Sequence, residues 1–142
     1  MSFIPAEDYE KIIEVLPVLC VDIVIQNSTG KYLLIKRVNE PLKGQWWVVG
    51  GRVHKNESLE HAAIRKVKEE VSLNLSNIFL LGYYEEVFNE NPFDLECSLH
   101  TVSVVFSTVV SGSQKIKLDS QSSDWKYSSV LPSNFSYKGI IL

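Results

Sequence analysis

The chain carries two kinds of hydrophobic pattern, one typical of strands and one typical of helices. Runs rich in Val, Ile and aromatic residues between turn residues indicate β-strands, whereas a repeat of three to four residues indicates a helix. The pattern predicts strands over residues 18–26, 32–37, 46–49, 78–88 and 101–110, a short strand over 125–127, and helices over 6–15 and 58–73. After residue 127 too little chain remains for another full element, apart from one helical turn near Val130.

These elements predict the fold class. Several strands around one central helix, with a weaker helix near the N-terminus, favour an α+β fold in which a mixed sheet is sandwiched between helices. The 142 residues are enough for one domain with a substantial core. No internal repeat or linker interrupts them, so we expect a single domain over residues 1–142.

The helix over residues 58–73 has two carboxylates where packing alone would not place them. Winding it at about 100° per residue gives an apolar arc formed by Leu59, Ala62, Ala63, Val67 and Val71. Glu70 lies inside this arc, and Glu69 lies at its rim. Burying an unpaired carboxylate costs several kcal/mol, and a hard divalent cation is a common compensation. The pattern therefore predicts a divalent metal site beside this helix.

The residues before the helix predict a tight turn and a defined helix start. Gly50 and Gly51 allow close approach of the backbone, and Asn56 is a good N-cap residue. Glu57 and Glu60 suit the positive end of the helix dipole.

The spacing of these residues resembles the Nudix box, the sequence motif of the Nudix hydrolases. The matching residues are Gly51, Glu57, Arg65, Glu69, Glu70 and Leu73. The chain departs from the motif at Lys66, where the general pattern has a third glutamate, and at Ser72, where it has a glycine. The resemblance implies an α/β/α sandwich with a central mixed sheet. It also implies hydrolysis of nucleoside diphosphate derivatives with Mg²⁺ or, alternatively, Mn²⁺.

Within the family the chain looks most like the GDP-mannose mannosyl hydrolases. The similar segments lie within residues 5–110 and include V-D-I-V-I-Q-N-S-T-G, L-L-I-K-R-V-N-E-P-L-K-G-Q-W-W-V-V-G-G-R-V and K-N-E-S-L-E. Those enzymes also lack the glutamate that Lys66 replaces. The resemblance implies that water attacks the anomeric carbon of a nucleotide sugar and that GDP leaves intact. It further implies a homodimer, since the related hydrolases are dimers.

The resemblance also implies the metal ligands. The carbonyl of Gly50 and the carboxylate of Glu70 would bind the cation, with Gln121 as a third ligand from a polar loop over residues 118–124. Glu69 would add a ligand or support the others.

Three further residues are expected to contact the substrate or to orient it. Arg37 and Arg52 would bind the diphosphate, because a planar guanidinium suits phosphate oxygens. Asp22, a carboxylate in an otherwise apolar strand, would orient one arginine or reach the substrate. The alternative for Asp22 is a solvent-facing or edge position.

Arg65 and the tryptophan pair have two interpretations each. Arg65 would orient Glu57 or Glu69 in the catalytic site, and the alternative is an ordinary helix-surface pair with Glu69. Trp46 and Trp47 alternate across a strand, so we expect one in the core and the other, taken as Trp46, against the nucleotide base.

Two departures concern the general base. The mannosyl hydrolases have a histidine just after the metal-binding glutamine, whereas Ser122 follows Gln121 here. They also have a tyrosine where Thr101 stands. The remaining candidates for a base are Glu86, Asp124, His100 and an adjacent acidic loop residue. Two other functions therefore stay open: a Nudix pyrophosphatase that cleaves between phosphates, and a nucleotide-sugar-binding module without catalysis.

Composition narrows the class of protein. The net charge of −3 argues against general nucleic-acid binding, which favours a basic domain. Cys20 and Cys97 lack the spacing of a zinc site or a disulfide framework. No signal peptide or apolar run of membrane length is visible. We therefore expect a cytoplasmic protein with no membrane partner.

Overall fold

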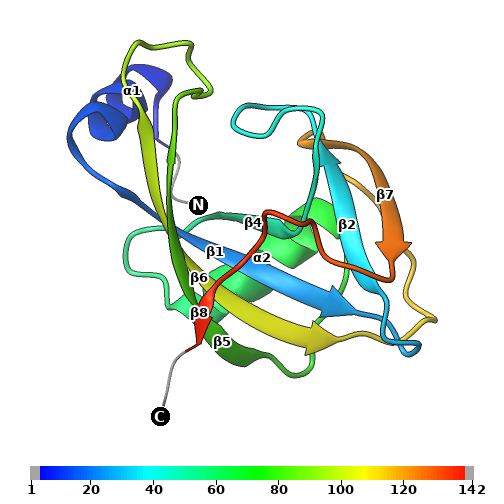
Figure 1. The fold of residues 1–142 in the computed structure, drawn as a ribbon. Coiled ribbons are helices and arrows are strands. Elements are labelled where there is room, and N and C mark those ends of the chain that lie inside the picture. The colour runs from blue at the N-terminus through cyan, green and yellow to red at the C-terminus, as the bar shows by residue number, and fades with distance from the viewer. Residues whose placement is uncertain (1–3, 140–142) are drawn as a thin grey trace.

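The computed structural model describes residues 4–139, which form a twisted sheet with two helices (Figure 1). The helices are α1 (Ala6–Val15) and α2 (Leu59–Val71). The strands are β1 (Val18–Gln26), β2 (Tyr32–Arg37), β3 (Trp46–Trp47), β4 (Val49–Arg52), β5 (Phe79–Phe88), β6 (Leu99–Val109), β7 (Ser122–Ser128) and β8 (Lys138–Gly139). Within residues 4–139, no helix is both long enough and apolar enough to cross a membrane.

The sheet is mixed, as predicted. Its strand order is β3-β2-β1-β6-β5-β8, with β4 also paired to β1 and β7 also paired to β2. The β1–β6 pair is parallel, and the other pairs in the described chain are antiparallel. The expected α+β class with a central mixed sheet and flanking helices is therefore confirmed.

Strand β1 is buried on both faces and separates two parts of the core. Val21, Ile23 and Ile25 pack with the apolar side of α2, whereas Val24 packs with Trp47 in a second cluster. Alternate residues of a strand point to opposite faces, so Asp22 lies on the face away from α2. Burial on both faces explains why this strand reads as a nearly continuous apolar run.

The two helices cover different parts of the sheet (Figure 1). The buried side of α2 includes Ala62, Ala63, Val67 and Val71, as its apolar arc predicts. Helix α1 lies near the ends of β5 and β6, where Ile13 packs against Val18 and Leu99.

Several expected element boundaries were wrong because pairing partners change along the chain. The predicted strand over 46–49 is two strands, since β3 pairs with β2 and β4 pairs with β1. Strand β7 begins at Ser122, inside the predicted loop, because its first residues pair with β2. Strand β8 was not predicted, and the described chain has bends rather than a helical turn near Val130.

The start of α2 also differs from the expectation. The N-cap is Ser58, whose side-chain oxygen accepts a hydrogen bond of 3.1 Å from the backbone N–H of His61. Asn56 instead adopts a left-handed backbone conformation with φ of 66° in the turn before the helix. Asn is one of the residues that tolerates this conformation.

Gly82 permits the C-terminal strand to pair with β5. It lies next to a register shift between Leu80 and Gly82 and pairs with Gly139 of β8. A Cβ atom at Gly82 would overlap the backbone carbonyl of Lys138, whereas a Cβ atom at Gly139 would meet nothing within 4 Å. Close approach of a second backbone is a common reason for glycine inside a strand.

We therefore expect Gly82→Ala to lower the free energy of unfolding by about 1–3 kcal/mol, as overpacking does. Gly139→Ala, in the facing position of the same pair, is the matched control and should change it by less than about 0.5 kcal/mol. Urea denaturation of the three proteins measures both effects. Equal stability of the two variants would show that the β5–β8 contact does not depend on Gly82.

Candidate functional site

A pocket of about 180 Å³ opens on the face of the sheet away from α2. Its floor is polar and comes from three neighbouring strands, with Asp22 on β1, Tyr84 on β5, and Thr101 and Ser103 on β6. Other lining residues are Tyr9, Arg37, Trp47, Gly50, Arg52 and Phe88. The pocket thus brings together residues from α1 and six strands, including four of the predicted site residues.

Asp22 is buried in the floor, with 6% of its surface exposed. The hydroxyl of Tyr84 donates a hydrogen bond to its Oδ2 atom. Burial raises the pKa of Asp22 to about 6, although Tyr84 and the Arg37 guanidinium favour the charged form. The solvent-facing or edge alternative for Asp22 is therefore wrong, because β1 is central and this side chain is enclosed.

Gly50 makes room for Asp22. A Cβ atom at this position would overlap the Asp22 carboxylate and would lie 2.5 Å from the carbonyl oxygen of Val21. The two residues are cross-strand partners in the β1–β4 pair. A buried carboxylate on β1 therefore requires glycine at position 50.

The two predicted phosphate-binding arginines lie on different sides of the pocket. The Nε atom of Arg37 donates a 2.8 Å hydrogen bond to the carbonyl of Pro41 in the loop after β2. The guanidinium carbon of Arg52 lies 5.8 Å from the ring centroid of Tyr9 on α1. Helix α1 and the β2–β3 loop thus help to position the positive charges that the sequence assigns to substrate binding.

Glu70 is the buried carboxylate of α2, with only 1% of its surface exposed. Its Oε2 atom accepts a 3.3 Å hydrogen bond from the backbone N–H of Gly50, and its Oε1 atom lies 3.5 Å from Nζ of Lys66. Burial raises the pKa of Glu70 to about 7, and the Lys66 ammonium opposes that rise. The predicted burial of this carboxylate is correct, and a lysine provides its nearest countercharge.

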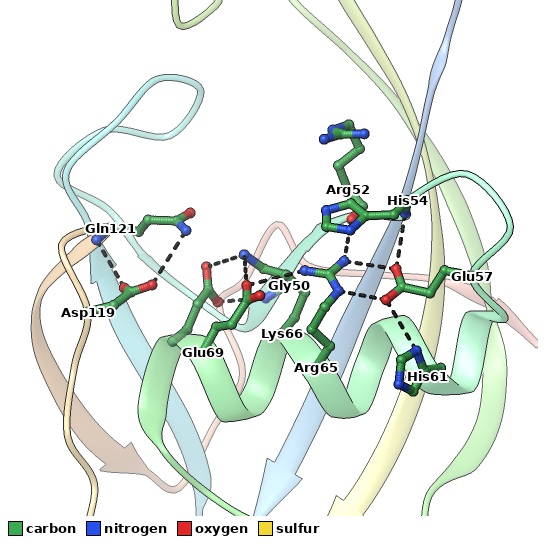
Figure 2. A network of polar contacts seen from close by, with 11 residues as sticks. Gly50, Arg52, His54, Glu57, His61, Arg65, Lys66, Glu69, Asp119 and Gln121 are labelled. Atoms are coloured by element: carbon green, nitrogen blue, oxygen red, sulfur yellow. Dashed lines mark hydrogen bonds and ion pairs between the residues drawn. The ribbon is translucent and has the colours of Figure 1, made fainter. Parts of the chain in front are cut away.

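The other predicted metal ligands are spread more widely (Figure 2). The Glu69 side chain is 41% exposed and pairs with Arg65 and Lys66 at 3.2 and 3.7 Å. Gln121 is exposed, and its backbone N–H and side-chain amide donate to Asp119 at 3.0 and 3.5 Å (Figure 2). The backbone N–H of Asp119 in turn donates to the Glu70 carbonyl at 3.2 Å. The structure therefore places Glu69 and Glu70 together on α2, and Asp119 connects the loop of Gln121 to the end of that helix.

The donors beside α2 fit one hard cation. Carboxylate and carbonyl oxygens are the ligand types that Mg²⁺ prefers, and Glu70, Glu69 and the Gly50 carbonyl are of these types. Among residues 4–139, no three His, Cys, Asp or Glu side chains form a group that could hold a metal ion. The chemistry of the donors thus agrees with a cation that keeps several waters or substrate oxygens as ligands.

Arg65 lies outside the pocket and ties three segments together (Figure 2). Its Nε and one terminal nitrogen donate to the two Glu57 oxygens at 2.7 and 2.9 Å. It also donates to the carbonyl of Arg52 at 3.0 Å and to Glu69 at 3.2 Å. The helix-surface pair with Glu69 exists, but the buried fork with Glu57 gives Arg65 a positioning role.

Trp47, rather than Trp46, lines the pocket. The Trp46 ring lies 4.3 Å from Nζ of Lys126, measured to the ring centroid, and Trp47 packs edge-to-face on Phe135. The two rings differ because neighbouring strand residues point to opposite faces. The assignment of Trp46 to a base pocket thus finds no support in this geometry.

The candidates for a general base fall on different faces of the sheet. Glu86 lies between Tyr84 and Phe88 on β5 and pairs with Thr101, so it shares the pocket face. His100 pairs with the exposed Val87 and belongs to the other face. Burial raises the pKa of Glu86. Asp124 is exposed on β7, pairs with Lys36 of β2, and is not among the residues that line the pocket.

Sequence reasoning missed Tyr84, Ser103 and Tyr9. The alternation of Tyr84, Glu86 and Phe88 with Thr101 and Ser103 on the facing strand is the signal that identifies one wall of the pocket.

Ser122 is buried, and within the described chain its hydroxyl has no hydrogen-bond partner. Position 122 is thus inside a strand pair with β2 rather than in an open loop.

Comparisons with known proteins bear on the family and the fold of the chain. A family model described as NUDIX domain matches residues 16–133. The low-salt glycan biosynthesis protein Agl8 of Haloferax volcanii is 32% identical over 123 residues, which are 87% of this chain and 78% of that protein. An ADP-ribose pyrophosphatase of Methanocaldococcus jannaschii is 38% identical over 98 residues, which are 69% of this chain and 54% of that protein.

Two solved structures illustrate the likeness of fold. A MutT NUDIX hydrolase from Burkholderia pseudomallei has a TM-score of 0.70 at 24% identity and covers 84% of this chain and 90% of its own. The NUDIX domain of Shewanella oneidensis NrtR, complexed with ADP ribose, has a TM-score of 0.64 at 23% identity and covers 87% and 82%. At this identity the likeness shows the fold alone.

The Glu57–Arg65 pair generates a pH-dependent prediction. Hydrogen bonds from Arg65 hold the pKa of Glu57 at about 2, below its ordinary value of 4.5. A carboxyl whose pKa falls on folding stabilises the protein fully above its unfolded pKa, and this contribution is lost as the pH falls through the folded pKa. Glu57→Gln should therefore lower the free energy of unfolding by about 1–3 kcal/mol at pH 7.

The difference in the free energy of unfolding between wild type and Glu57→Gln should stay constant from pH 7 to about 5. It should shrink as the pH falls from about 4.5 to 2. Urea denaturation at several pH values measures it. Glu60→Gln, an exposed change in the first turn of the same helix, is the control and should differ from wild type by less than about 0.5 kcal/mol. A difference in unfolding free energy that stays constant down to pH 3 would show that the ionised Glu57 carboxylate does not stabilise the fold through Arg65.

Proposed function

The chain belongs to the Nudix family, and from this premise we propose that it hydrolyses a nucleoside diphosphate sugar, with GDP-mannose as the expected substrate. Water would attack the anomeric carbon of the sugar, the bond from that carbon to the β-phosphate oxygen would break, and GDP would leave with the electron pair. The free sugar is the second product.

The observation that carries this proposal is the composition of the pocket. Arg37 and Arg52 offer two guanidinium groups for a diphosphate, and the floor offers a buried carboxylate together with the hydroxyls of Tyr84 and Ser103. Guanidinium groups suit phosphate oxygens, whereas a sugar presents several hydroxyls that need both donors and acceptors. A pocket with charged sides and a polar floor therefore favours a phosphorylated sugar over an apolar ligand.

Mg²⁺, or alternatively Mn²⁺, is the cofactor that we propose. Glu70 and the Gly50 carbonyl would hold it, with Gln121 as a third ligand from the loop before β7 and Glu69 as a further ligand or support. The bound ion would supply positive charge to the diphosphate leaving group. Arg37 and Arg52 would add to that charge, and Arg65 would keep the Arg52 backbone in place through their 3.0 Å hydrogen bond.

We assign the general base to Glu86. It lies on the pocket face between two lining residues, and burial raises its pKa toward the range of a working base. Its carboxylate would accept the proton of the attacking water. Asp22, held by Tyr84, would instead bind sugar hydroxyls or orient Arg37.

Two relatives bear on the choice of reaction. The likeness to a glycan biosynthesis protein fits a nucleotide sugar as substrate. The 38% identity to an ADP-ribose pyrophosphatase favours the second candidate, a pyrophosphatase that cleaves between the phosphates, although the chain spans only 54% of that protein. A homodimer and a cytoplasmic location stay predictions.

A ³¹P NMR time course with GDP-mannose, Mg²⁺ and ¹⁸O-water distinguishes these reactions. We expect GDP to accumulate beside free mannose that carries the ¹⁸O label. GMP with mannose 1-phosphate, and label on phosphorus, would mean attack at phosphorus and would establish the second candidate. No turnover with GDP-mannose or other sugar nucleotides, together with tight GDP binding, would indicate a binding module.

The role of Glu86 has a test of its own. Glu86→Gln should lower kcat by about 10²–10⁴-fold, the usual contribution of a general base, and should remove the acidic limb of the pH–rate profile. His100→Gln changes a neighbouring residue on the other face of the same strand pair and should leave kcat and the profile unchanged. Loss of activity in the His100 variant, with retention in the Glu86 variant, would reverse the assignment.

A further inference from the structure

Lys66 is a buried lysine inside the carboxylate site. Only 6% of its surface is exposed, and lysine is almost never buried to this extent unless it is paired. Its ammonium lies 3.5 Å from Glu70 Oε1 and 3.7 Å from Glu69 Oε2 (Figure 2). It therefore contacts both carboxylates of the proposed metal site.

The fold makes space for this side chain. A Cβ atom at Gly51 would overlap Cε of Lys66 and would lie 3.0 Å from its Nζ atom. The aliphatic part of the lysine thus passes against the bare backbone of β4 on its way to Glu70. Position 51 must be small for the ammonium to reach the pair.

We propose that the Lys66 ammonium is a fixed cation of this site, which occupies one side of the Glu69–Glu70 pair and leaves room for a single divalent ion. The proposal rests on the proposed function in one respect, since it takes this pair as the metal-binding carboxylates. It concerns the number and affinity of bound ions and not the reaction.

Charge balance supports the proposal. The two carboxylates contribute two negative charges, Lys66 neutralises one of them, and Arg65 also lies 3.2 Å from Glu69. Asp119 adds a negative charge near Glu70, and Glu57 balances Arg65, so one divalent ion brings this cluster to neutrality and a second would leave it with a net charge of +2. The same ammonium compensates the buried Glu70 before metal binds. The bound ion would therefore compete with Lys66 for the carboxylates.

Mn²⁺ binding measured by calorimetry and by electron paramagnetic resonance tests this inference. We expect one Mn²⁺ per chain in the wild type and in Lys66→Gln, with an affinity about tenfold or more higher in the variant because the competing charge is gone. Lys68→Gln removes the same charge from an exposed position on the same helix. It is the matched control and should change the affinity by less than about twofold, since solvent and salt screen exposed charges.

Two ions bound to the wild type, or equal affinities of wild type and Lys66→Gln, would overturn the proposal. Lys66→Glu should bind a second Mn²⁺, and a single ion in that variant would also contradict it. If Lys66→Gln does not fold, the numbers of Mn²⁺ ions bound per chain by the wild type and by Lys66→Glu still test the proposal. Because these readouts need no turnover, a protein that binds one Mn²⁺ as expected but hydrolyses no nucleotide sugar would refute the proposed function alone.

Discussion

The burial of the Glu70 carboxylate beside β4 is the constraint on which the site depends. A carboxylate with 1% exposure requires a hydrogen-bond donor and positive charge close by. The Gly50 N–H supplies the donor at 3.3 Å, and Lys66 supplies the charge at 3.5 Å. Lys66 needs the space left by the missing side chain at Gly51, whereas glycine at position 50 makes room for the buried Asp22. The turn between β4 and α2 is then held to the helix by Glu57 and Arg65.

The same glycine pair connects the two faces of the sheet. Gly50 lies against Asp22 on the pocket face and donates its N–H to Glu70 on the helix side. A change in the position of β4 would therefore disturb the buried carboxylate of each face at once. Arg52 follows two residues later, so the pocket arginine, the polar floor and the helix carboxylates all depend on one short strand. This coupling explains why the hydrogen bond from Arg65 to the Arg52 carbonyl, outside the pocket, belongs to the site.

Sequence patterns predicted the helices and strands whose ends are set by neighbouring residues in the sequence. Helix α1, β1 and β2 have the expected bounds, because Pro17 and the turn over residues 27–30 end the patterns sharply. The burial of Glu70 followed from its place in the apolar arc of α2. By contrast, the polar start of β7 becomes a strand only because β2 offers it a free edge. The burial of Lys66 could not be predicted from its helix position alone, since it depends on the space at Gly51.

The carboxyl groups of the site separate by environment, and this separation indicates their roles. Arg65 holds the pKa of Glu57 at about 2, so that group stays ionised and serves to fix the turn. Burial raises the pKa of Asp22 to about 6 and that of Glu70 to about 7. Burying an ionisable carboxyl group costs free energy, and carboxyl groups with shifted pKa values in a cleft are characteristic of functional sites, where a ligand or a cation compensates the charge. Glu57, whose ionised form stabilises the fold, therefore lies outside the pocket. Asp22 and Glu70, whose ionised forms are disfavoured by burial, lie where the proposed substrate and cation would bind.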